Sequence, residues 1–330
     1  MGKTRKEKGN IFRYVAIGLV LVFLLSAALL LIEVWEKRQG RFPVSESQES
    51  FLEYNGTNYV LKDNIETFLV LGLDKFEGTF TSDSYNNDRQ ADFLVLFVFD
   101  NSSKKCTAVH INRDTMADMS VLGVAGEKVN EVTKQIALAH TYGNGKEVSC
   151  RNTADAVSEL LLGIKVNHYI SLTMDSVPIL NDLVGGVEVT VLDDFTGIDS
   201  VLVKGESVTL KGEHALNYVR TRYGLEDSSN STRMERQKQY MQALYSQMTS
   251  CIENDDEFIV NAASKLGNYI VSDRSVTQLQ EIAKKFTTYE FNEISSIEGE
   301  SVMGEKFIEF YPDEASLKKI VVDLFYKPKD

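Results

Sequence analysis

The sequence lacks the short patterns that mark several common classes of enzyme. GxxxxGK followed by Ser or Thr, HExxH, CxxC and GxSxG are all missing from its 330 residues. Its four histidines are scattered without the spacing that is typical of metal ligands. These absences argue against a P-loop nucleotide site, a zinc site and a serine hydrolase of the nucleophile-elbow type.

An excess of positive charge is also missing. The chain has 35 Lys and Arg residues against 48 Asp and Glu residues, which gives a net charge of −13. A protein this acidic is not expected to bind nucleic acid over a broad surface. Any anion that it binds must therefore be met by a local cluster of Arg or Lys. With 43% hydrophobic and 25% charged residues, the composition is otherwise ordinary for a folded α/β protein.

A long uncharged apolar run is present near the N-terminus, from Tyr14 to Ile32. At about 1.5 Å per helical residue, this run is long enough to cross the hydrocarbon core of a bilayer. The basic residues that precede it are Lys3, Arg5, Lys6, Lys8 and Arg13. By the positive-inside rule they predict a single-pass protein of the cell membrane, with a cytoplasmic N-terminus and an extracytoplasmic C-terminal domain. A cleaved signal peptide is the alternative, although its apolar region is normally shorter and no A-x-A-like site follows Leu31.

Only three cysteines occur, Cys106, Cys150 and Cys251, and the predicted topology places all of them outside the cytoplasm. A disulfide is allowed in such an oxidising compartment. Cys106 and Cys150 are the preferred pair, because both lie beside the same predicted sheet. Three buried free thiols are the alternative.

Short β-rich apolar runs alternate with helical patterns in the rest of the chain. Strands are predicted at 67–73, 93–99, 107–111, 168–174, 186–192 and 306–310, and helices at 130–139, 153–162, 232–252, 257–266, 275–286 and 313–326. This alternation predicts an α/β fold in which a mixed central β-sheet is flanked by helices. The expected organisation is a basic tail at 1–13, a transmembrane helix at 14–32, a polar stalk at 33–62 and one extracytoplasmic domain at 63–330.

Charged residues stand at the ends of three predicted strands. Asp74 follows the first strand, Asp92 precedes the second, and Arg113 and Asp114 follow the third. If these strands are neighbours, the side chains meet on one rim of the sheet, where open α/β folds bind ligands. Asp74 and Asp92 could then hold Mg²⁺, which prefers oxygen ligands and often shares them with a substrate phosphate. The ordinary turn chemistry of Asp is the alternative for each of them.

A second polar group surrounds the start of the predicted helix at 232–252. It consists of Arg220, Arg222, Arg233, Arg236 and Gln237. Thr232 and Glu235 form a T-x-x-E capping box that fixes the helix start, so the last three residues of the group share one face of its first turns. Cations are unfavourable at a helix N-terminus, and an opposing phosphate relieves the conflict. The pattern predicts a phosphate site, with a solvated basic face or salt bridges to nearby acidic residues as the alternative.

At these residues the sequence resembles the LytR-CpsA-Psr family of bacterial envelope proteins. The segments that carry the resemblance are FLVLGLD (68–74), QADFLVLFVFD (90–100), HINRDT (110–115), LVGGVEV (183–189), LKGEHALNYVRTR (210–222) and RMERQ (233–237). They stand in the order of the family's motifs and span roughly residues 64–245. The short basic tail and the single predicted anchor are similar to those of the family as well.

The resemblance implies an enzyme that transfers a glycopolymer from a polyprenyl-pyrophosphate carrier to peptidoglycan and forms a phosphodiester. The polymer would be a teichoic acid, a capsular polysaccharide or a secondary wall polysaccharide. A Mg²⁺ site at Asp74 and Asp92 and an apolar tunnel for the prenyl chain are also implied. The implied pyrophosphate-binding residues are Arg113, Arg220, Arg222, Arg233, Arg236 and Gln237. Arg113 and Asp114 are the implied catalytic residues, with Asp114 either a base for the acceptor hydroxyl or a structural salt-bridge partner.

Four positions depart from the family pattern, and one of them is Phe76, which stands where a second basic residue is expected after Asp74. Gln90 stands where a basic residue is expected, Asn112 where a proline is expected, and Asn230 where an acidic residue is common. These departures indicate either a divergent subgroup that handles another polymer or a member with weakened catalysis.

Two other functions fit the same residues. Hydrolysis of the same lipid pyrophosphate is one, and a non-catalytic binder that regulates envelope assembly is the other. The enzyme hypotheses require the carboxylates and arginines to converge beside an apolar tunnel. The binder hypothesis gains if every arginine is paired with an acidic side chain and no tunnel exists.

Overall fold

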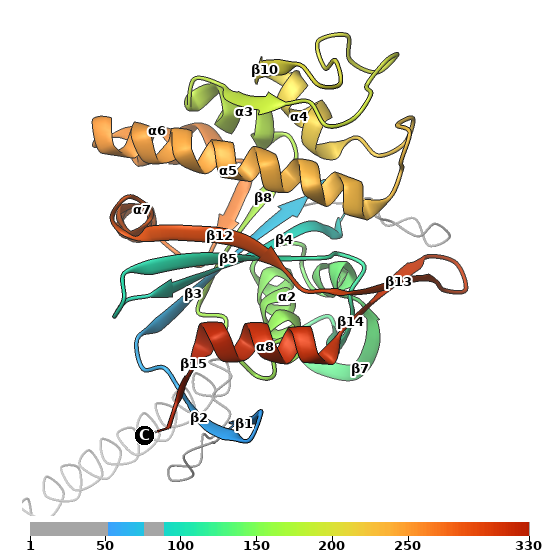
Figure 1. Ribbon diagram of the computed structural model, residues 1–330, viewed down its shortest axis with the longest axis vertical. Coiled ribbons are helices and arrows are strands. Elements are labelled where there is room, and N and C mark those ends of the chain that lie inside the picture. The colour runs from blue at the N-terminus through green and yellow to red at the C-terminus, as the bar shows by residue number, and fades with distance from the viewer. Residues whose placement is uncertain (1–51, 76–88, 330) are drawn as a thin grey trace, which may run out of the picture. The chain divides into compact units, whose positions relative to one another are not determined.

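A computed structural model describes residues 52–75 and 89–329 of the chain (Figure 1). The chain divides into two compact units, Met1–Ser50 and Phe51–Asp330, and the described residues all belong to the second. The predicted basic tail, the predicted transmembrane helix at 14–32 and most of the predicted stalk lie outside the described residues. Within 52–75 and 89–329, no helix combines the length and the apolar character that crossing a bilayer requires.

A six-stranded mixed sheet forms the centre of the described chain. Its strands in spatial order are β11 (Ile270–Ser272), β8 (His168–Thr173), β3 (Ile65–Leu73), β4 (Ala91–Asp100), β5 (Lys105–Ile111) and β12 (Glu290–Ser296). The pairs β3–β8 and β5–β12 are parallel, whereas β3–β4, β4–β5 and β8–β11 are antiparallel. The predicted α/β fold with a mixed central sheet is confirmed.

The central strands bury side chains on both faces of the sheet. In β4 the residues that join the core on the first face are Leu94, Leu96 and Val98, and those that join the core on the second face are Val95, Phe97 and Phe99. Successive side chains of a strand point to opposite faces, so an unbroken apolar run is stable only where both faces are covered. This is the reason that FLVLGL and FLVLFVF, which show no polar alternation, form adjacent strands.

Helices cover both faces of the sheet, and Figure 1 shows α2 and α8 on one side of it and α5 and α6 on the other. The first face is covered by α2 (Glu147–Leu160), α8 (Glu314–Phe325) and the 3-10 helix η2 (Ile136–Thr141). The second face is covered by α5 (Asn230–Asn254), α6 (Phe258–Leu266) and α7 (Val276–Thr288). A further core joins α5 to α3 (Ser176–Leu183), α4 (Glu213–Arg220) and the hairpin β9–β10 (Val187–Thr190, Ser207–Leu210).

Smaller sheets complete the described chain. They are formed by β1 (Leu52–Tyr54), β2 (Thr57–Leu61) and β15 (Tyr326–Pro328), by β6 (Met116–Leu122) and β7 (Lys128–Gln135), and by β13 (Gly299–Met303) and β14 (Ile308–Pro312). Residues 52–61 were expected in the stalk. They are instead two strands, and β2 pairs with β15 at the other end of the chain. The folded region therefore begins about ten residues before the predicted boundary at residue 63.

Two local predictions on the first face are wrong. The helix expected at 130–139 is the strand β7 followed by η2, because β7 pairs with β6 along its whole length. The helix expected at 153–162 begins earlier, at Glu147. Asn152 and Thr153, which flank the predicted start, therefore lie inside the helix. Their side chains lie buried inside α2, where Asn152 donates hydrogen bonds to the carbonyls of Ser120 and Ala139.

The predicted disulfide between Cys106 and Cys150 is wrong as well. All three cysteines are free thiols, and the sheet separates the two that were paired. Cys106 packs in the core of the second face, whereas Cys150, in α2, packs in the core of the first. Burial raises the pKa of Cys106 to about 12 and that of Cys150 to about 11. Cys251 is only half-buried.

We predict that a maleimide reagent labels only Cys251 in the folded protein. The thiolate is the reactive form, and burial suppresses it at Cys106 and Cys150. Unfolding in guanidinium without any reductant should raise the number of labels from one to three, counted by intact-mass spectrometry. A count that stays at one after unfolding would show that the two buried cysteines are bonded after all.

Candidate active site

Three strands of the central sheet bring charged residues to one edge. Asp74 follows β3, and Asp92 lies near the start of the neighbouring strand β4. The register between these strands shifts at this point, because Leu73 pairs with Ala91 while Gly72 pairs with Phe93, which leaves Asp92 as the extra residue of a β-bulge. A bulge re-aims the side chain that it carries, and such bulges are common next to active sites.

Gly72 is what lets the chains approach at this bulge. A Cβ atom at position 72 would lie 2.9 Å from the Cβ atom of Phe93, closer than two such atoms can pack. Ile111, the last residue of β5, pairs with Leu94 of β4, so Arg113 and Asp114 reach the same edge as Asp92. The sequence-based expectation that these strand ends are neighbours is confirmed.

Arg113 lies at the centre of this edge. Its guanidinium pairs with the carboxylate of Asp92 and donates a hydrogen bond to the side-chain oxygen of Gln90. Its Nε atom lies 3.4 Å from Oδ1 of Asp114. Gln90 is buried and lacks the positive charge expected at its position, and it serves Arg113 as a neutral hydrogen-bond acceptor.

Asp114 is a buried carboxylate beside several cations. Arg113, Arg222 and Arg233 all lower its pKa, but burial has the larger effect, so its pKa lies above the ordinary value. Its Oδ1 atom accepts a hydrogen bond of 3.0 Å from Gln135 of β7. The salt-bridge role that the sequence left open for Asp114 is therefore present, and its raised pKa also suits a group that takes up a proton.

Helix α5 brings a row of polar side chains to the same place. The helix starts at Asn230 rather than near Thr232, because Ser229 is its cap and accepts a hydrogen bond from the backbone N–H of Thr232. The expected capping box is wrong by three residues. The buried residues of α5 are Asn230, Arg233, Arg236, Gln237 and Tyr240, whose spacing puts them on one face.

Arg236 has no exposed surface, and other groups of the protein bind its guanidinium. It forms an ion pair of 2.9 Å with Asp193, which follows β9, and it donates hydrogen bonds to the backbone oxygens of Tyr218 and Thr221. The expected contact of Arg236 with pyrophosphate does not fit this geometry. The structure gives Arg236 a positioning role, in which it fixes α5 against α4 and the segment after β9.

Gln237 contacts the backbone of α4 and also lines a cavity. Its side chain donates a hydrogen bond of 3.1 Å to the backbone oxygen of Val219, and both residues line the apolar cavity described below.

The other arginines of the group differ in their partners. Arg220 pairs with Asp74 at 3.2 Å, and half of its side chain is exposed. Arg222 stacks on the ring of Tyr223 and donates to its hydroxyl at 2.6 Å. Arg233 is buried, and its only hydrogen bond among the described residues goes to Oδ1 of Asn230, at 2.5 Å.

Arg233 is therefore a buried cation without a carboxylate partner among the residues that the structure describes. Burial is the first cause that lowers its pKa to about 10, and the charges of Arg113 and Arg222 lower it further, while the nearby charge of Asp114 acts in the opposite direction. The guanidinium stays protonated at neutral pH. A buried charge of this kind is costly unless an anion approaches it.

The two carboxylates expected to bind Mg²⁺ fit that ion only in part. Asp74 and Asp92 lie on neighbouring strands at one edge and offer the oxygen ligands that Mg²⁺ prefers. Each is paired with an arginine, and no described group of three or more His, Cys, Asp or Glu side chains is arranged to hold a metal alone. This donor set suits Mg²⁺ that is shared with a ligand phosphate, since the ion usually binds through one or two carboxylates and the phosphate groups.

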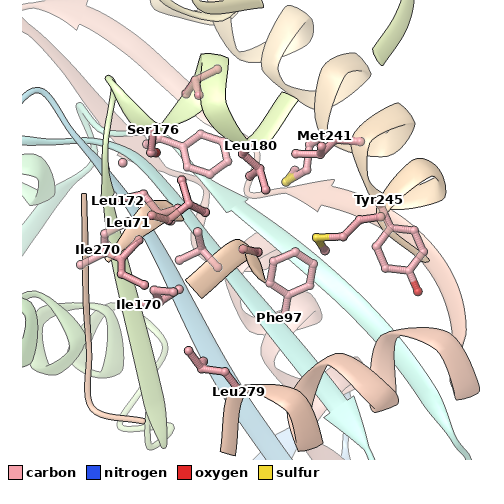
Figure 2. A pocket seen from close by; sticks show the side chains of 18 of the residues that line it. Leu71, Phe97, Ile170, Leu172, Ser176, Leu180, Met241, Tyr245, Ile270 and Leu279 are labelled. Atoms are coloured by element: carbon pink, nitrogen blue, oxygen red, sulfur yellow. The ribbon is translucent and has the colours of Figure 1, made fainter. Parts of the chain in front are cut away.

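An apolar cavity of about 320 Å³ opens between the second face of the sheet and helices α3, α5, α6 and α7 (Figure 2). Figure 2 shows Phe97 and Ile170 of the sheet pointing toward Leu180, Met241 and Tyr245 of the helices. None of the described residues that line the cavity is charged.

The cavity and the charged edge adjoin. Lining residue Phe93 directly follows Asp92 in the sequence, and lining residue Gln237 lies one helical turn after Arg233. The convergence that the enzyme hypotheses require is thus present, and Arg222 and Arg233 remain without acidic partners within the described chain.

Some residues of this site were missed from the sequence alone. Gln135 lies in the segment that was expected to be helical, so its contact with Asp114 was not foreseen. The hydrogen bond between Asn112 and Asn230, 2.8 Å long, joins two positions that were noted only as departures from the family pattern. Their simultaneous change was the one signal that could have paired them.

The LytR_cpsA_psr family model matches residues 38–324. This chain belongs to the LytR_cpsA_psr family. Membership confirms the resemblance that the six separated motifs indicated, and the match contains every residue of the charged edge and of the cavity.

Other LytR_cpsA_psr proteins are similar over most of the folded unit. The polyisoprenyl-teichoic acid–peptidoglycan teichoic acid transferase TagU of Enterococcus faecalis is 26% identical over 249 residues, covering 74% of this chain and 73% of TagU. The cell wall biosynthesis protein LcpA of Corynebacterium glutamicum is 29% identical over 246 residues, which cover 67% of this chain but 46% of LcpA. The chain thus spans about half the length of LcpA.

The fold is also that of a solved structure. The crystal structure of B. subtilis TagV superposes with a TM-score of 0.59 and 23% identity, covering 80% of this chain and 96% of TagV. The mixed sheet and its flanking helices are therefore shared with TagV.

We predict that Arg236→Met lowers the free energy of unfolding by about 3–5 kcal/mol, because it leaves Asp193 without its buried counter-ion. Denaturant unfolding of the full chain in detergent measures the change. Lys319→Ala is the control, since it removes an exposed pair with Asp323 that is worth less than about 1 kcal/mol. Equal effects of the two substitutions would contradict the positioning role of Arg236.

Proposed function

We propose that this protein transfers a glycopolymer, of the teichoic-acid type or a related wall or capsular type, from a polyprenyl-pyrophosphate carrier to peptidoglycan. Its membership of the LytR_cpsA_psr family and its similarity to TagU, a protein named as a teichoic acid transferase, support this activity. The observation that carries the proposal is a buried arginine, Arg233, that forms no ion pair with a carboxylate of the described residues and lies one helical turn from Gln237, which lines the apolar cavity.

A lipid pyrophosphate matches both halves of this site. Its prenyl chain needs an apolar, uncharged cavity, and its pyrophosphate needs cations that can donate hydrogen bonds to its oxygen atoms. The cavity provides the first, and Arg222 and Arg233 provide the second. Arginine suits the task because its planar guanidinium can donate two hydrogen bonds to one phosphate group.

In the proposed reaction, a hydroxyl oxygen of peptidoglycan attacks the phosphorus atom that carries the glycan. The P–O bond to the polyprenyl phosphate breaks, and polyprenyl monophosphate leaves with the bonding electrons. Arg222 and Arg233 stabilise the negative charge that develops on this leaving group, as positioned cations do in phosphoryl transfer. Arg113 holds the edge in place through its contacts with Asp92 and Asp114 and lies beside the same phosphates.

Asp114 takes the proton of the acceptor hydroxyl in this proposal. Its carboxylate lies next to Arg113 and is held by Gln135, so its position is fixed. A raised pKa makes it a stronger base than an exposed aspartate.

Mg²⁺ is the cofactor that we propose, with Asp74 and Asp92 as the residues that would hold it. When bound, the ion would supply positive charge against the phosphate oxygens. Arg220, which pairs with Asp74, would lie beside it.

We further propose that the protein is a single-pass membrane protein whose C-terminal domain lies outside the cytoplasm. The proposal rests on the basic residues that precede the apolar run at 14–32. A donor whose prenyl chain sits in a bilayer and an acceptor in the cell wall are consistent with this location.

The proposal is tested with the full chain in detergent, a polyprenyl-pyrophosphate-linked glycan and a peptidoglycan oligosaccharide. We expect a phosphodiester-linked product by mass spectrometry, with Mg²⁺ present and not after its removal by EDTA. Arg233→Ala should slow its formation by about 10²-fold or more, the usual effect of removing a group that stabilises transition-state charge. Ala263→Trp, which fills the cavity, should raise KM for long-chain donors and leave a short-chain donor little affected.

The other functions predict different products in the same assay. Release of phosphorylated glycan without transfer would indicate the hydrolase. Tight binding of the donor with no turnover would indicate the non-catalytic binder. If Ala263→Trp raised KM equally for long-chain and short-chain donors, the assignment of the cavity to the prenyl chain would be contradicted.

We predict that the transfer rate falls as the pH drops through the raised pKa of Asp114, because only the ionised carboxylate can accept a proton. Asp114→Asn should lower kcat by about 10²-fold or more and remove this acidic limb. Rates measured against pH for both proteins test the role. An unchanged acidic limb in Asp114→Asn would assign the titration to another group and leave Asp114 a salt-bridge partner only.

A further inference from the structure

A chain of three buried side chains connects the loop after β5 to the first turn of α5. Asn230 donates a hydrogen bond of 2.8 Å from Nδ2 to Oδ1 of Asn112, and Arg233 donates one of 2.5 Å to Oδ1 of Asn230. Asn112 is 8% exposed, and Asn230 and Arg233 are each 7% exposed. The same oxygen of Asn112 accepts the backbone N–H of Asp114 at 2.9 Å. These hydrogen bonds thus connect Arg233 to the backbone of Asp114, the proposed catalytic base.

An amide at position 230 matches both hydrogen bonds that this side chain forms. Asn230 accepts from Arg233 with its oxygen and donates to Asn112 with its nitrogen. A carboxylate at position 230 could still accept from Arg233, but it has no N–H to donate to Asn112. Position 112 is different. The side-chain oxygen of Asn112 accepts one hydrogen bond from Asn230 and one from the backbone of Asp114, and a carboxylate at position 112 could accept both.

The amide also decides the charge around Arg233. A carboxylate at position 230 would hold the guanidinium equally well and would neutralise it. The neutral oxygen of Asn230 fixes the same guanidinium without adding a negative charge to it. Among the described residues no acidic side chain forms an ion pair with Arg233, and Asp114 acts on it only through its charge. By contrast, the edge arginines Arg113 and Arg220 are each paired with aspartates.

We propose that Asn230 is a positioning residue that aims Arg233 at the bound phosphates while leaving its positive charge available to them. This inference rests on the proposed pyrophosphate site. It deepens that proposal by naming the residue that holds the buried cation in place without adding a negative charge beside it. Asn112 accepts a hydrogen bond from Asn230 and another from the backbone of Asp114, so it connects these two residues.

The test is the binding of inorganic pyrophosphate to the full chain in detergent, measured by isothermal titration calorimetry. We expect Asn230→Asp to weaken binding by about tenfold or more, because the new carboxylate competes with the anion for Arg233. The thermal midpoint of the ligand-free protein should stay level or rise. A carboxylate is favourable in the first turn of a helix and next to a buried arginine.

Weaker pyrophosphate binding without a loss of thermal stability separates a charge effect from a packing effect. A residue that served only the packing of α5 would lose stability on substitution and keep its affinity for pyrophosphate. Asn261→Asp is the matched control, because it adds the same charge on the exposed surface of α6, and it should leave the affinity within about twofold of the wild type.

A second variant decides the question if Asn230→Asp fails to fold. Asn112→Asp keeps both accepted hydrogen bonds and adds a negative charge one side chain further from Arg233, so a smaller loss of affinity is expected. Full affinity in a folded Asn230→Asp protein, or in Asn112→Asp if that is the only folded variant, would overturn the inference. A wild-type protein that binds no pyrophosphate would overturn the pyrophosphate site itself, and with it this inference.

Discussion

The ion pair between Arg236 and Asp193 is the contact on which the rest of the site depends. Arg236 is fully buried and also binds the backbone of the α4 segment, so it determines where α5 lies. Arg233 precedes it by almost one turn, and Gln237 follows it directly. A shift of α5 would therefore move the buried cation and the wall of the apolar cavity together. One arginine whose guanidinium is bound by protein groups positions both halves of the proposed lipid-pyrophosphate site.

The separation of charge from apolar surface follows from the sheet. Its central strands are apolar on both faces, so the charged residues can stand only where the strands end. The bulge at Asp92 turns a carboxylate toward Arg113 at the point where the apolar run of β4 begins. One strand thus supplies a charged contact at the edge and, from Phe93 onward, the floor of the cavity. A ligand with a charged head and an apolar tail fits this order.

The sequence predicted the elements that have a single physical cause. The strands of FLVLGLD and FLVLFVF and the charged ends of three strands were predicted, because apolar runs and terminal charges are local features. It failed where partners decide the outcome. The segment around Gln135 has a helical spacing of apolar residues, yet pairing with β6 makes it a strand. Cys106 and Cys150 lie beside one sheet, but only the fold shows that they are on opposite faces. Arg236 was assigned to a ligand because its burial could not be seen.

Three departures from the family pattern gain a common explanation from the fold, and the fourth, Phe76, lies outside the described residues. From the sequence, Gln90, Asn112 and Asn230 indicated either a divergent subgroup or a weakened site. In the structure all three are buried, and each forms a hydrogen bond with another part of the site. A buried polar group without a hydrogen-bond partner is costly. Each of these three side chains has a partner, which indicates that the site is an ordered hydrogen-bonded structure. Asn112 and Asn230 also bind each other, so these two departures form one hydrogen-bonded arrangement. Their joint presence therefore favours a divergent subgroup with a retained site over a member that has lost its catalysis.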